Sequence, residues 1–221
     1  MIGRNNDGAA VRGYVLAGGA SRRFGADKAL AEIGGRTLLS RACEMLSQAA
    51  GSAQVVAPAG RYLDQNIKLI QDRWPDEGPL GGIITALRTT SNDATGESWN
   101  LILSCDMPFL TRDLLSYLYR RAASGEAEVV VPQSDYGLEP LCACWRTSAV
   151  DSLQSLFDGG MRKVTDAMKQ LRMEILDETH WKRFDSAGRL FWNMNTRQDY
   201  QAALQIWRAG ESERDRPFQR N

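Results

Sequence analysis

The segment from Tyr14 to Leu30 brings several phosphate-binding side chains together in a short stretch. It reads YVLAGGASRRFGADKAL, an apolar run that ends at two glycines. The residues that follow and could contact an anion are Ser21, Arg22, Arg23 and Lys28. Glycines let a backbone approach a ligand closely and direct its amides at it, while arginine and lysine neutralise charge. We therefore predict that this loop binds a nucleoside triphosphate.

The loop matches neither of the two common nucleotide motifs. Lys28 does not directly follow a glycine, as a Walker loop requires, and the spacing GxGxxG is absent. A charged surface turn after a strand is the simpler interpretation. The phosphate-binding interpretation is favoured because the loop should leave the carboxyl end of the first strand, where open α/β sheets bind ligands.

A second candidate is Asp106, which follows the apolar run Asn100–Ser104. A carboxylate at the end of a buried strand can hold Mg²⁺, which accepts one or two carboxylates and takes its remaining ligands from water and phosphate. The alternative is that Asp106 forms an Asx turn before Pro108. The residue types alone do not separate these two roles.

The glycine-rich segment resembles the signature loop of the molybdenum cofactor guanylyltransferases, LAGG-x-S-x-R-(M/F)-G-x-D-K. The matching positions are Leu16-Ala17-Gly18-Gly19, Ser21, Arg23, Phe24-Gly25, Asp27 and Lys28. Related transferases carry a proline before the lysine or lack the aspartate, so Asp27-Lys28 favours the guanylyl branch. The resemblance extends over roughly Arg12 to Ile206 and is densest in this loop.

Further segments resemble elements of the same family. Cys105–Pro108 is similar to its CD-x-P element, which implies that Asp106 is the metal ligand. Asp72 with Gly78-Pro79 resembles its D…GPL-x-G element, which implies contacts to the nucleotide and its base. Glu139-Pro140-Leu141 resembles an edge of the acceptor pocket.

Asn193 and Asn195 resemble the family's N-x-NTP-E-(D/E)-L element and would bind the acceptor through their amides. A helix N-cap at Asn195 or Thr196 is the alternative. This chain has Arg197-Gln198 where the family usually has Pro-Glu.

The resemblance implies transfer of GMP from GTP to the phosphate of molybdopterin, with Mg²⁺ as cofactor. Lys28, Arg23 and Asp106 would be catalytic. The implied nucleotide-binding residues are Leu16, Ala17, Gly18, Gly19, Ser21, Arg22, Lys28, Asp72, Gly78, Pro79 and Asp106. The family also implies association with molybdoenzyme maturation proteins.

Two other functions stay open. Ala57 stands where some relatives place a guanine-contacting asparagine, so a cytidylyltransferase, or another nucleotidyltransferase that uses a small phosphorylated acceptor, is one alternative. A non-catalytic nucleotide-binding protein that delivers cofactor is the other. Intact Lys28 and Asp106 argue against the second.

The composition limits the class of protein. In 221 residues, 27 Lys+Arg balance 27 Asp+Glu, whereas a nucleic-acid binder normally carries a basic excess. We find no signal-like leader or membrane-length apolar run, so we expect a cytoplasmic protein without a membrane partner. Cys142 and Cys144 could suggest a metal, but strand alternation places both on one face, and we expect buried, reduced thiols.

Alternating apolar periodicities predict a single Rossmann-like domain over 11–208, an α/β fold with a mostly parallel sheet and helices on both faces. The family resemblance implies that this is a nucleotidyltransferase domain. Residues 1–10 should form a flexible lead-in and 209–221 a charged, disordered tail. The expected strands are Val11–Ala17, Gln54–Ala57, Ile67–Ile70, Asn100–Ser104, Val129–Val131, Leu138–Trp145 and Arg172–Leu176. The expected helices are Arg36–Ala49, Leu80–Thr90, one from a Thr111 cap through Arg121, Ser148–Phe157, Met161–Lys169, and one from a Thr196 cap to about Trp207.

Overall fold

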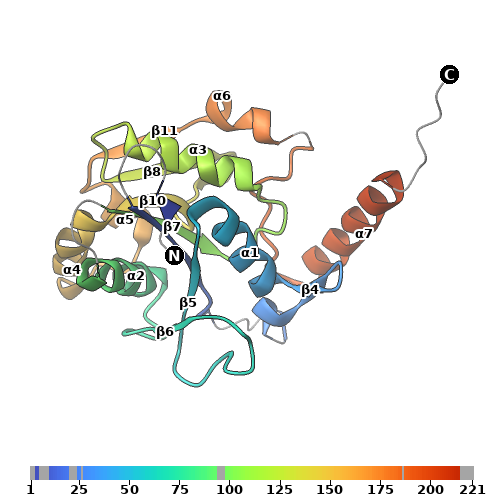
Figure 1. Ribbon diagram of the computed structural model, residues 1–221, viewed down its shortest axis with the longest axis horizontal. Helices are drawn as coiled ribbons and strands as arrows, with labels where there is room; N and C mark the ends of the chain where they lie inside the picture. The colour runs from blue at the N-terminus through green and yellow to red at the C-terminus, as the bar shows by residue number, and fades with distance from the viewer. Residues whose placement is uncertain are drawn as a thin grey trace.

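A twisted, mostly parallel sheet lies at the centre of the molecule, and helices cover both of its faces (Figure 1). This is a computed structural model, and it describes residues 3–4, 10–19, 24–25, 27–93, 98–185 and 187–214. The sheet strands are β1 (Gly3–Arg4), β2 (Ala10–Leu16), β5 (Ala53–Ala57), β6 (Leu69–Gln71), β7 (Ser98–Ser104), β8 (Val129–Ser134), β9 (Gly137–Leu138), β10 (Cys142–Arg146) and β11 (Met173–Leu176). A separate hairpin pairs β3 (Glu32–Ile33) with β4 (Arg36–Thr37).

The α-helices in the described part of the chain are α1 (Leu38–Ala50), α2 (Pro79–Asp93), α3 (Arg112–Ala123), α4 (Val150–Asp158), α5 (Val164–Met168), α6 (Glu178–Trp181) and α7 (Arg197–Arg214). Short 3₁₀ segments are η1 (Lys28–Leu30), η2 (Thr147–Ala149) and η3 (Lys182–Phe184).

The strand order across the sheet is β11-β8-β10-β7-β2-β5-β6. All of these strands run in one direction except β10, which is antiparallel to both β7 and β8. The carboxyl ends of β2, β5, β6, β7 and β8 therefore lie at one edge. This arrangement confirms the expected α/β class and places the loops after β2, β6 and β7 together, as ligand-binding α/β sheets do.

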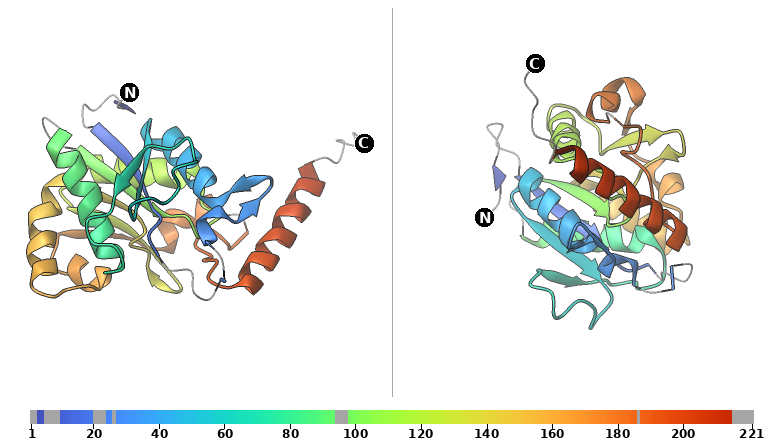
Figure 2. Two further views of the ribbon diagram at one scale, coloured as in Figure 1. Left: turned by 90° about the horizontal axis from the view of Figure 1, so that it is seen from below. Right: turned by 90° about the vertical axis from the view of Figure 1, so that its right-hand side faces the viewer.

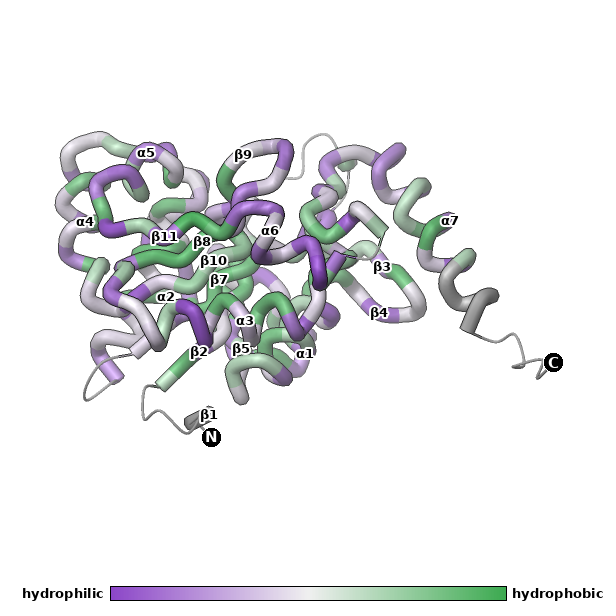
Figure 3. The backbone as a smooth tube through the Cα atoms, turned by 90° about the horizontal axis from the view of Figure 1, so that it is seen from above, coloured by the Kyte–Doolittle hydropathy of each residue, from purple (hydrophilic) through white to green (hydrophobic). Residues whose placement is uncertain are grey.

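Alternation along the buried strands divides the core into two layers. Val15 and Leu103 pack in the layer that contains α1 and α3, whereas Tyr14 and Ile102 pack in the layer that contains α2, α4 and α5. Because successive side chains of a strand point to opposite faces, a strand that is covered on both faces is apolar over most of its length. Figure 3 shows this hydrophobic centre surrounded by more polar peripheral helices.

Several element boundaries differ from the prediction. The expected strand Leu138–Trp145 is two strands, because Pro140 has no amide for a ladder and Cys142 N turns back to the carbonyl of Glu139. The helix expected over Met161–Lys169 begins only at Val164, after Gly159-Gly160. Thr37, in the short strand β4, is the N-cap of α1.

The last helix is longer than expected. Thr196 Oγ1 accepts a hydrogen bond from Asp199 N at its start, as predicted, but α7 continues to Arg214 instead of ending near Trp207. Figure 2 shows α7 lying beside the β3–β4 hairpin and extending away from the sheet. Tyr200 Oη donates to the carbonyl of Glu32 at 2.7 Å, which ties the helix to that hairpin.

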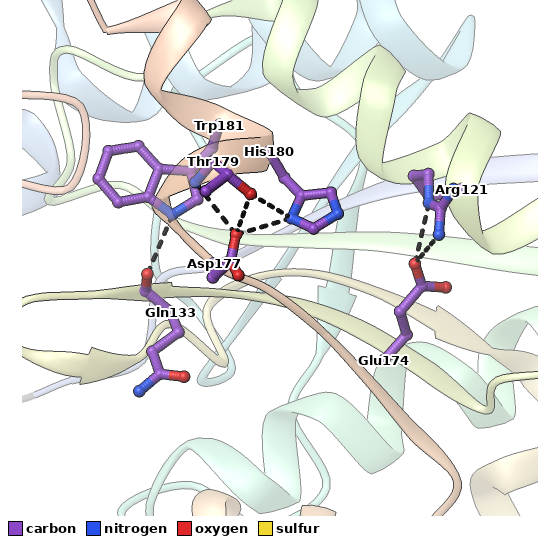
Figure 4. A network of polar contacts seen from close by, with 7 residues as sticks. All are labelled: Arg121, Gln133, Glu174, Asp177, Thr179, His180 and Trp181. Atoms are coloured by element: carbon purple, nitrogen blue, oxygen red, sulfur yellow. Dashed lines mark hydrogen bonds and ion pairs between the residues drawn. The ribbon is translucent and has the colours of Figure 1, made fainter.

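Polar contacts tie β11 to α3 and α6 to β8 at the outer end of the sheet (Figure 4). Arg121 of α3 pairs with Glu174, and Trp181 Nε1 donates to the carbonyl of Gln133. His180, the chain's single histidine, lies 2.8 Å from Asp177 through Nδ1. The histidine is thus engaged in a local helix-capping network. Within the described ranges, no helix combines the length and apolarity that crossing a bilayer needs.

Candidate functional site

Lys28 and Asp106 meet at the carboxyl edge of the sheet. Lys28 begins η1 after the glycine-rich loop, and Asp106 follows the central strand β7. Lys28 Nζ donates to Asp106 Oδ2 at 2.8 Å, and the two side chains are only 16% and 18% exposed. Because the pair is partly buried, solvent screens the attraction between the two charges less than it would at an exposed site. The structure thus joins two residues that the sequence analysis placed in one active site.

The Asp106 carboxylate is held by its own strand and by the C-terminal segment. Ser104 Oγ donates to its other oxygen, Oδ1. The Asp106 carbonyl accepts from Met194 N at 2.8 Å, which lays the segment before α7 alongside this turn. The Asx-turn alternative does not describe the position, since the side chain of Asp106 is directed to Lys28 and Ser104.

Asn195 completes this cluster from the far end of the chain. Its Oδ1 accepts from Lys28 Nζ at 3.4 Å. The backbone amides of Asn195 and Thr196 both donate to Asp199 Oδ2, at 2.8 and 2.7 Å, while Asp199 N returns a bond to Thr196 Oγ1. Burial opposes ionisation of Asp199, but these amide hydrogen bonds outweigh it and lower its pKa. This reciprocal cap fixes Asn195 at the site. Thr196 and Asp199 have the T-x-x-D spacing that is typical of such a cap at the start of a helix.

Asp72 lies beside the first glycine of the loop. A Cβ placed on Gly18 would come 3.6 Å from Asp72 Oδ2 and from Cδ of Pro58. Asp72 is buried, and its Oδ1 accepts from Trp74 N and from Thr85 Oγ1 of α2. The structure therefore brings Asp72 to the glycine loop, with one carboxylate oxygen engaged by its own turn.

Arg61 and Tyr62, which no motif marked, contact the two ends of the signature loop. Tyr62, in the turn after β5, has its Oη 3.2 Å from the carbonyl of Ala17 and 3.1 Å from Asp27 Oδ1. Arg61 Nη2 pairs with Asp27 Oδ2 at 2.5 Å. Asp27 Oδ1 also caps η1 by accepting from Ala29 N at 3.1 Å. No local pattern marked Arg61 or Tyr62, because both lie in a polar loop far from the motif.

The start of α7 contacts the loop from another side. Arg197 Nε donates to the carbonyl of Phe24 at 3.3 Å, and the Phe24 ring packs edge-on against Tyr200 with centroids 5.7 Å apart. Gly25 has a φ of 75° next to this guanidinium, a conformation that suits glycine. Arg197, which stands where the family usually has proline, thus contacts the loop.

Glu139 is a buried carboxylate near this edge. Its Oε1 accepts from Ser134 Oγ at 2.6 Å, and the side chain lies in the β9–β10 turn. Burial raises the pKa of Glu139, the Ser134 hydrogen bond partly offsets this, and the charge of Asp106 adds to the rise.

Other predicted residues are less closely connected. Asn193 Nδ2 donates to the carbonyl of Phe191, within its own segment. Gly78, with a φ of 89°, and Pro79 form the turn into α2, where Arg162 pairs with Glu77. Leu16 ends β2 against Gly82 of α2. The predictions for Ser21, Arg22 and Arg23 fall outside the described residues.

The residues present fit a divalent cation that arrives with phosphate. Across the described ranges, no group of three or more His, Cys, Asp and Glu side chains could enclose a metal by itself. Asp106 nevertheless offers a carboxylate near the glycine loop, and Mg²⁺ is commonly held by one or two carboxylates plus substrate phosphates and water. Asp106 is the residue that would hold it.

The Cys142–Cys144 pair takes no part in this site. Both thiols are buried in the layer with α1 and α3, whereas Ala143 and Trp145 face the other layer. The same-face prediction is confirmed, and all four cysteines are free thiols. Burial raises the pKa of Cys105, next to Asp106, to about 12, so its thiol stays protonated.

Comparison with known proteins agrees with this geometry. The model of the "MobA-like NTP transferase domain" family matches residues 13–173. The chain is 30% identical to "Molybdenum cofactor guanylyltransferase" of Desulfosudis oleivorans over 203 residues, which covers 91% of this chain and 98% of the relative. It is 31% identical to "Probable molybdenum cofactor guanylyltransferase" of Chloroflexus aggregans, over 86% of this chain and 91% of the relative.

A solved structure extends the similarity to three dimensions. The crystal structure of molybdopterin-guanine dinucleotide biosynthesis protein A from Archaeoglobus fulgidus superimposes with a TM-score of 0.76 at 26% identity, covering 90% of this chain and 99% of that one. The family match spans most of the chain and includes the Lys28–Asp106 site. This chain is therefore a member of the MobA-like NTP transferase family.

Proposed function

We propose that this protein transfers GMP from GTP to the terminal phosphate of molybdopterin and releases pyrophosphate. The observation that carries the proposal is the cluster of Lys28, Asp106 and Asn195 at the carboxyl edge of the sheet, directly after the glycine-rich loop. The relatives that cover nearly the whole chain carry the name of this activity.

In this reaction the acceptor phosphate attacks the α-phosphorus of GTP in line, and pyrophosphate leaves. No covalent intermediate with the protein is needed, so catalysis consists of positioning and charge stabilisation. The amides of Gly18 and Gly19 cradle the nucleotide, whereas the amide of Ala17 donates to the carbonyl of Val56 at 2.9 Å. Lys28 neutralises charge that develops on the phosphates. Arg22 and Arg23 of the signature loop add positive charge, and Ser21 adds a hydroxyl.

Asp106 would hold Mg²⁺, which would neutralise charge on the phosphate oxygens. Asp72 contacts the nucleotide next to Gly18, and the Gly78-Pro79 turn packs beside the base. On the acceptor side, Asn195 bridges to Lys28, while Asn193 and Glu139 border the molybdopterin pocket. We further propose that the protein delivers its product to molybdoenzyme maturation proteins.

The decisive experiment measures pyrophosphate release from GTP and from CTP, with Mg²⁺, in the presence and absence of molybdopterin. We expect release only from GTP with molybdopterin. Release from CTP in place of GTP would assign the protein to the cytidylyl branch. Tight nucleotide binding without pyrophosphate release from either nucleotide would favour a non-catalytic delivery protein.

A further inference from the structure

The Tyr62 hydroxyl lies between the two ends of the signature loop. One end is Ala17, whose carbonyl is 3.2 Å from Tyr62 Oη, and the other is Asp27, whose Oδ1 is 3.1 Å away. A phenol has one hydrogen to donate, so the hydroxyl is shared between the carbonyl and the carboxylate. The two acceptors belong to residues on opposite sides of the glycines and arginines of the loop.

Arg61 strengthens the same connection. Its guanidinium pairs with Asp27 Oδ2 and lies 5.2 Å from the centre of the Tyr62 ring. Asp27 is consequently held at both carboxylate oxygens, by Tyr62 and Ala29 N at Oδ1 and by Arg61 at Oδ2. Asp27 is the N-cap of η1, and Lys28 is the first residue of that segment. The contacts to Asp27 therefore set the position of Lys28.

Two further features indicate that Tyr62 is held in place for this contact. Tyr62 has a φ of 59°, a left-handed conformation that costs a bulky residue energy and persists only where its surroundings enforce it. Its ring is also buried, with 9% of the residue exposed. Burial, followed by the nearby charge of Asp27, raises the pKa of Tyr62, so the hydroxyl remains a donor at physiological pH.

We infer that Tyr62, assisted by Arg61, is a positioning residue that sets the spacing between the nucleotide-cradling amides of Gly18 and Gly19, which follow Ala17, and the Lys28 ammonium group. The inference rests on the proposed nucleotidyl transfer for its catalytic consequence. Tyr62 touches neither Lys28 nor Asp106 in any contact described above. It acts through Asp27, one residue before the lysine.

The test replaces Tyr62 with phenylalanine, which removes the hydroxyl and keeps the ring. Tyr14→Phe is a matched control, because Tyr14 Oη also makes a buried hydrogen bond, to Thr90 Oγ1 at 2.8 Å, but does so inside the other core layer. We expect Tyr62→Phe to lower kcat about tenfold, the scale of losing a hydrogen bond to a charged group. Tyr14→Phe should keep wild-type kcat even though it lowers the melting temperature. Wild-type kcat in Tyr62→Phe would overturn the inference.

A double-mutant cycle separates positioning from a general loss of structure. If Tyr62 acts through Lys28, then Tyr62→Phe should change turnover less than twofold when Lys28 is already alanine. A further tenfold loss in the Lys28→Ala background would contradict a role that passes through the lysine.

Hydrogen exchange of the free protein gives a readout that does not depend on activity. The amide of Ala29 donates to Asp27 Oδ1, so we expect its exchange to accelerate at least about fivefold in Tyr62→Phe and to stay unchanged in Tyr14→Phe. Unchanged exchange at Ala29 would overturn the positioning role. If wild-type protein releases no pyrophosphate with any nucleotide, the proposed function fails, yet the exchange result still decides whether Tyr62 holds the loop.

Discussion

The ammonium group of Lys28 lies 2.8 Å from the carboxylate of Asp106, although 78 residues separate them in the chain. Both oxygens of Asp106 accept hydrogen bonds, one from Lys28 and the other from Ser104. A cation that bound Asp106 would therefore compete with the lysine for this carboxylate. This relationship bears on both catalysis and metal binding.

Replacing Lys28 with alanine should raise the barrier to nucleotidyl transfer by about 2–4 kcal/mol, as removal of a charge-stabilising group commonly does. Lys28→Arg should recover only part of this loss, because a planar guanidinium cannot reproduce a compact ammonium between Asp106 and Asn195. Steady-state pyrophosphate release measures both variants. Lys68→Ala, at an exposed lysine of the β5–β6 loop, is the control and should retain full turnover. Turnover near the wild-type rate in Lys28→Ala would remove the lysine from the mechanism.

Removing the Lys28 charge should also strengthen metal binding to the free protein. Because Lys28 competes for Asp106 Oδ2, we expect Lys28→Met to bind Mn²⁺ without nucleotide at least about tenfold more tightly, which corresponds to about 1.4 kcal/mol. Electron paramagnetic resonance titration of free Mn²⁺ measures the affinity.

A general effect of net charge must be separated from this local competition. Lys68→Met removes one positive charge at an exposed position of the β5–β6 loop. It should leave Mn²⁺ affinity within about twofold of wild type, as expected for a screened, more distant charge. An equal gain in both variants would show that Lys28 does not block the Asp106 oxygen specifically.

Glu139 should make stability depend on pH. Its pKa is raised in the folded state by burial, so the folded protein holds this proton more tightly than the unfolded chain. Stability from this group is then fully present below the unfolded pKa of about 4.3 and is lost as pH rises through the raised folded value. Glu139→Gln keeps an acceptor for Ser134 and removes the titration.

The measurement for Glu139 is the difference in unfolding free energy between wild type and Glu139→Gln across that pH window. We expect the wild type to lose stability relative to the glutamine variant as pH rises. Parallel pH profiles for the two proteins would contradict a raised pKa at this position.

The β3–β4 turn offers a direct test of packing against α7. A Cβ at Gly34 would lie 2.5 Å from Trp207 Nε1, and its φ of 59° disfavours any side chain. We expect Gly34→Ala to cost about 2–3 kcal/mol of unfolding free energy, from overpacking and left-handed strain together. Urea denaturation measures this change.

Gly35 provides the matched comparison in the same turn. Its φ is 71°, but a Cβ there meets nothing within 4 Å. Gly35→Ala should therefore lose only the strain contribution of about 1–2 kcal/mol. Equal losses in the two variants would show that the side chain of Trp207 does not add to the cost of a methyl group at Gly34.

Local patterns accounted for much of the fold. Thr111 caps α3 through Leu114 N, and Asp113 lies in its first turn, because such contacts span only a few residues. Strand alternation placed Cys142 and Cys144 on one face for the same reason. Pro140 is also a local signal, and the prediction of one strand over Leu138–Trp145 was wrong because this proline divides it.

Residue types and their spacing identify the groups with which this protein can act on phosphates: the glycines and lysine of one loop, an aspartate after the central strand, and asparagines before the last helix. Which of these groups meet depends on long-range packing. Lys28 reaches Asp106 and Asn195 because parallel strands bring their carboxyl ends to one edge, and α7 returns there with its reciprocal cap. Arg61 and Tyr62 carried no signal at all, because a hydrogen bond between distant segments depends on the packing of every element that separates them.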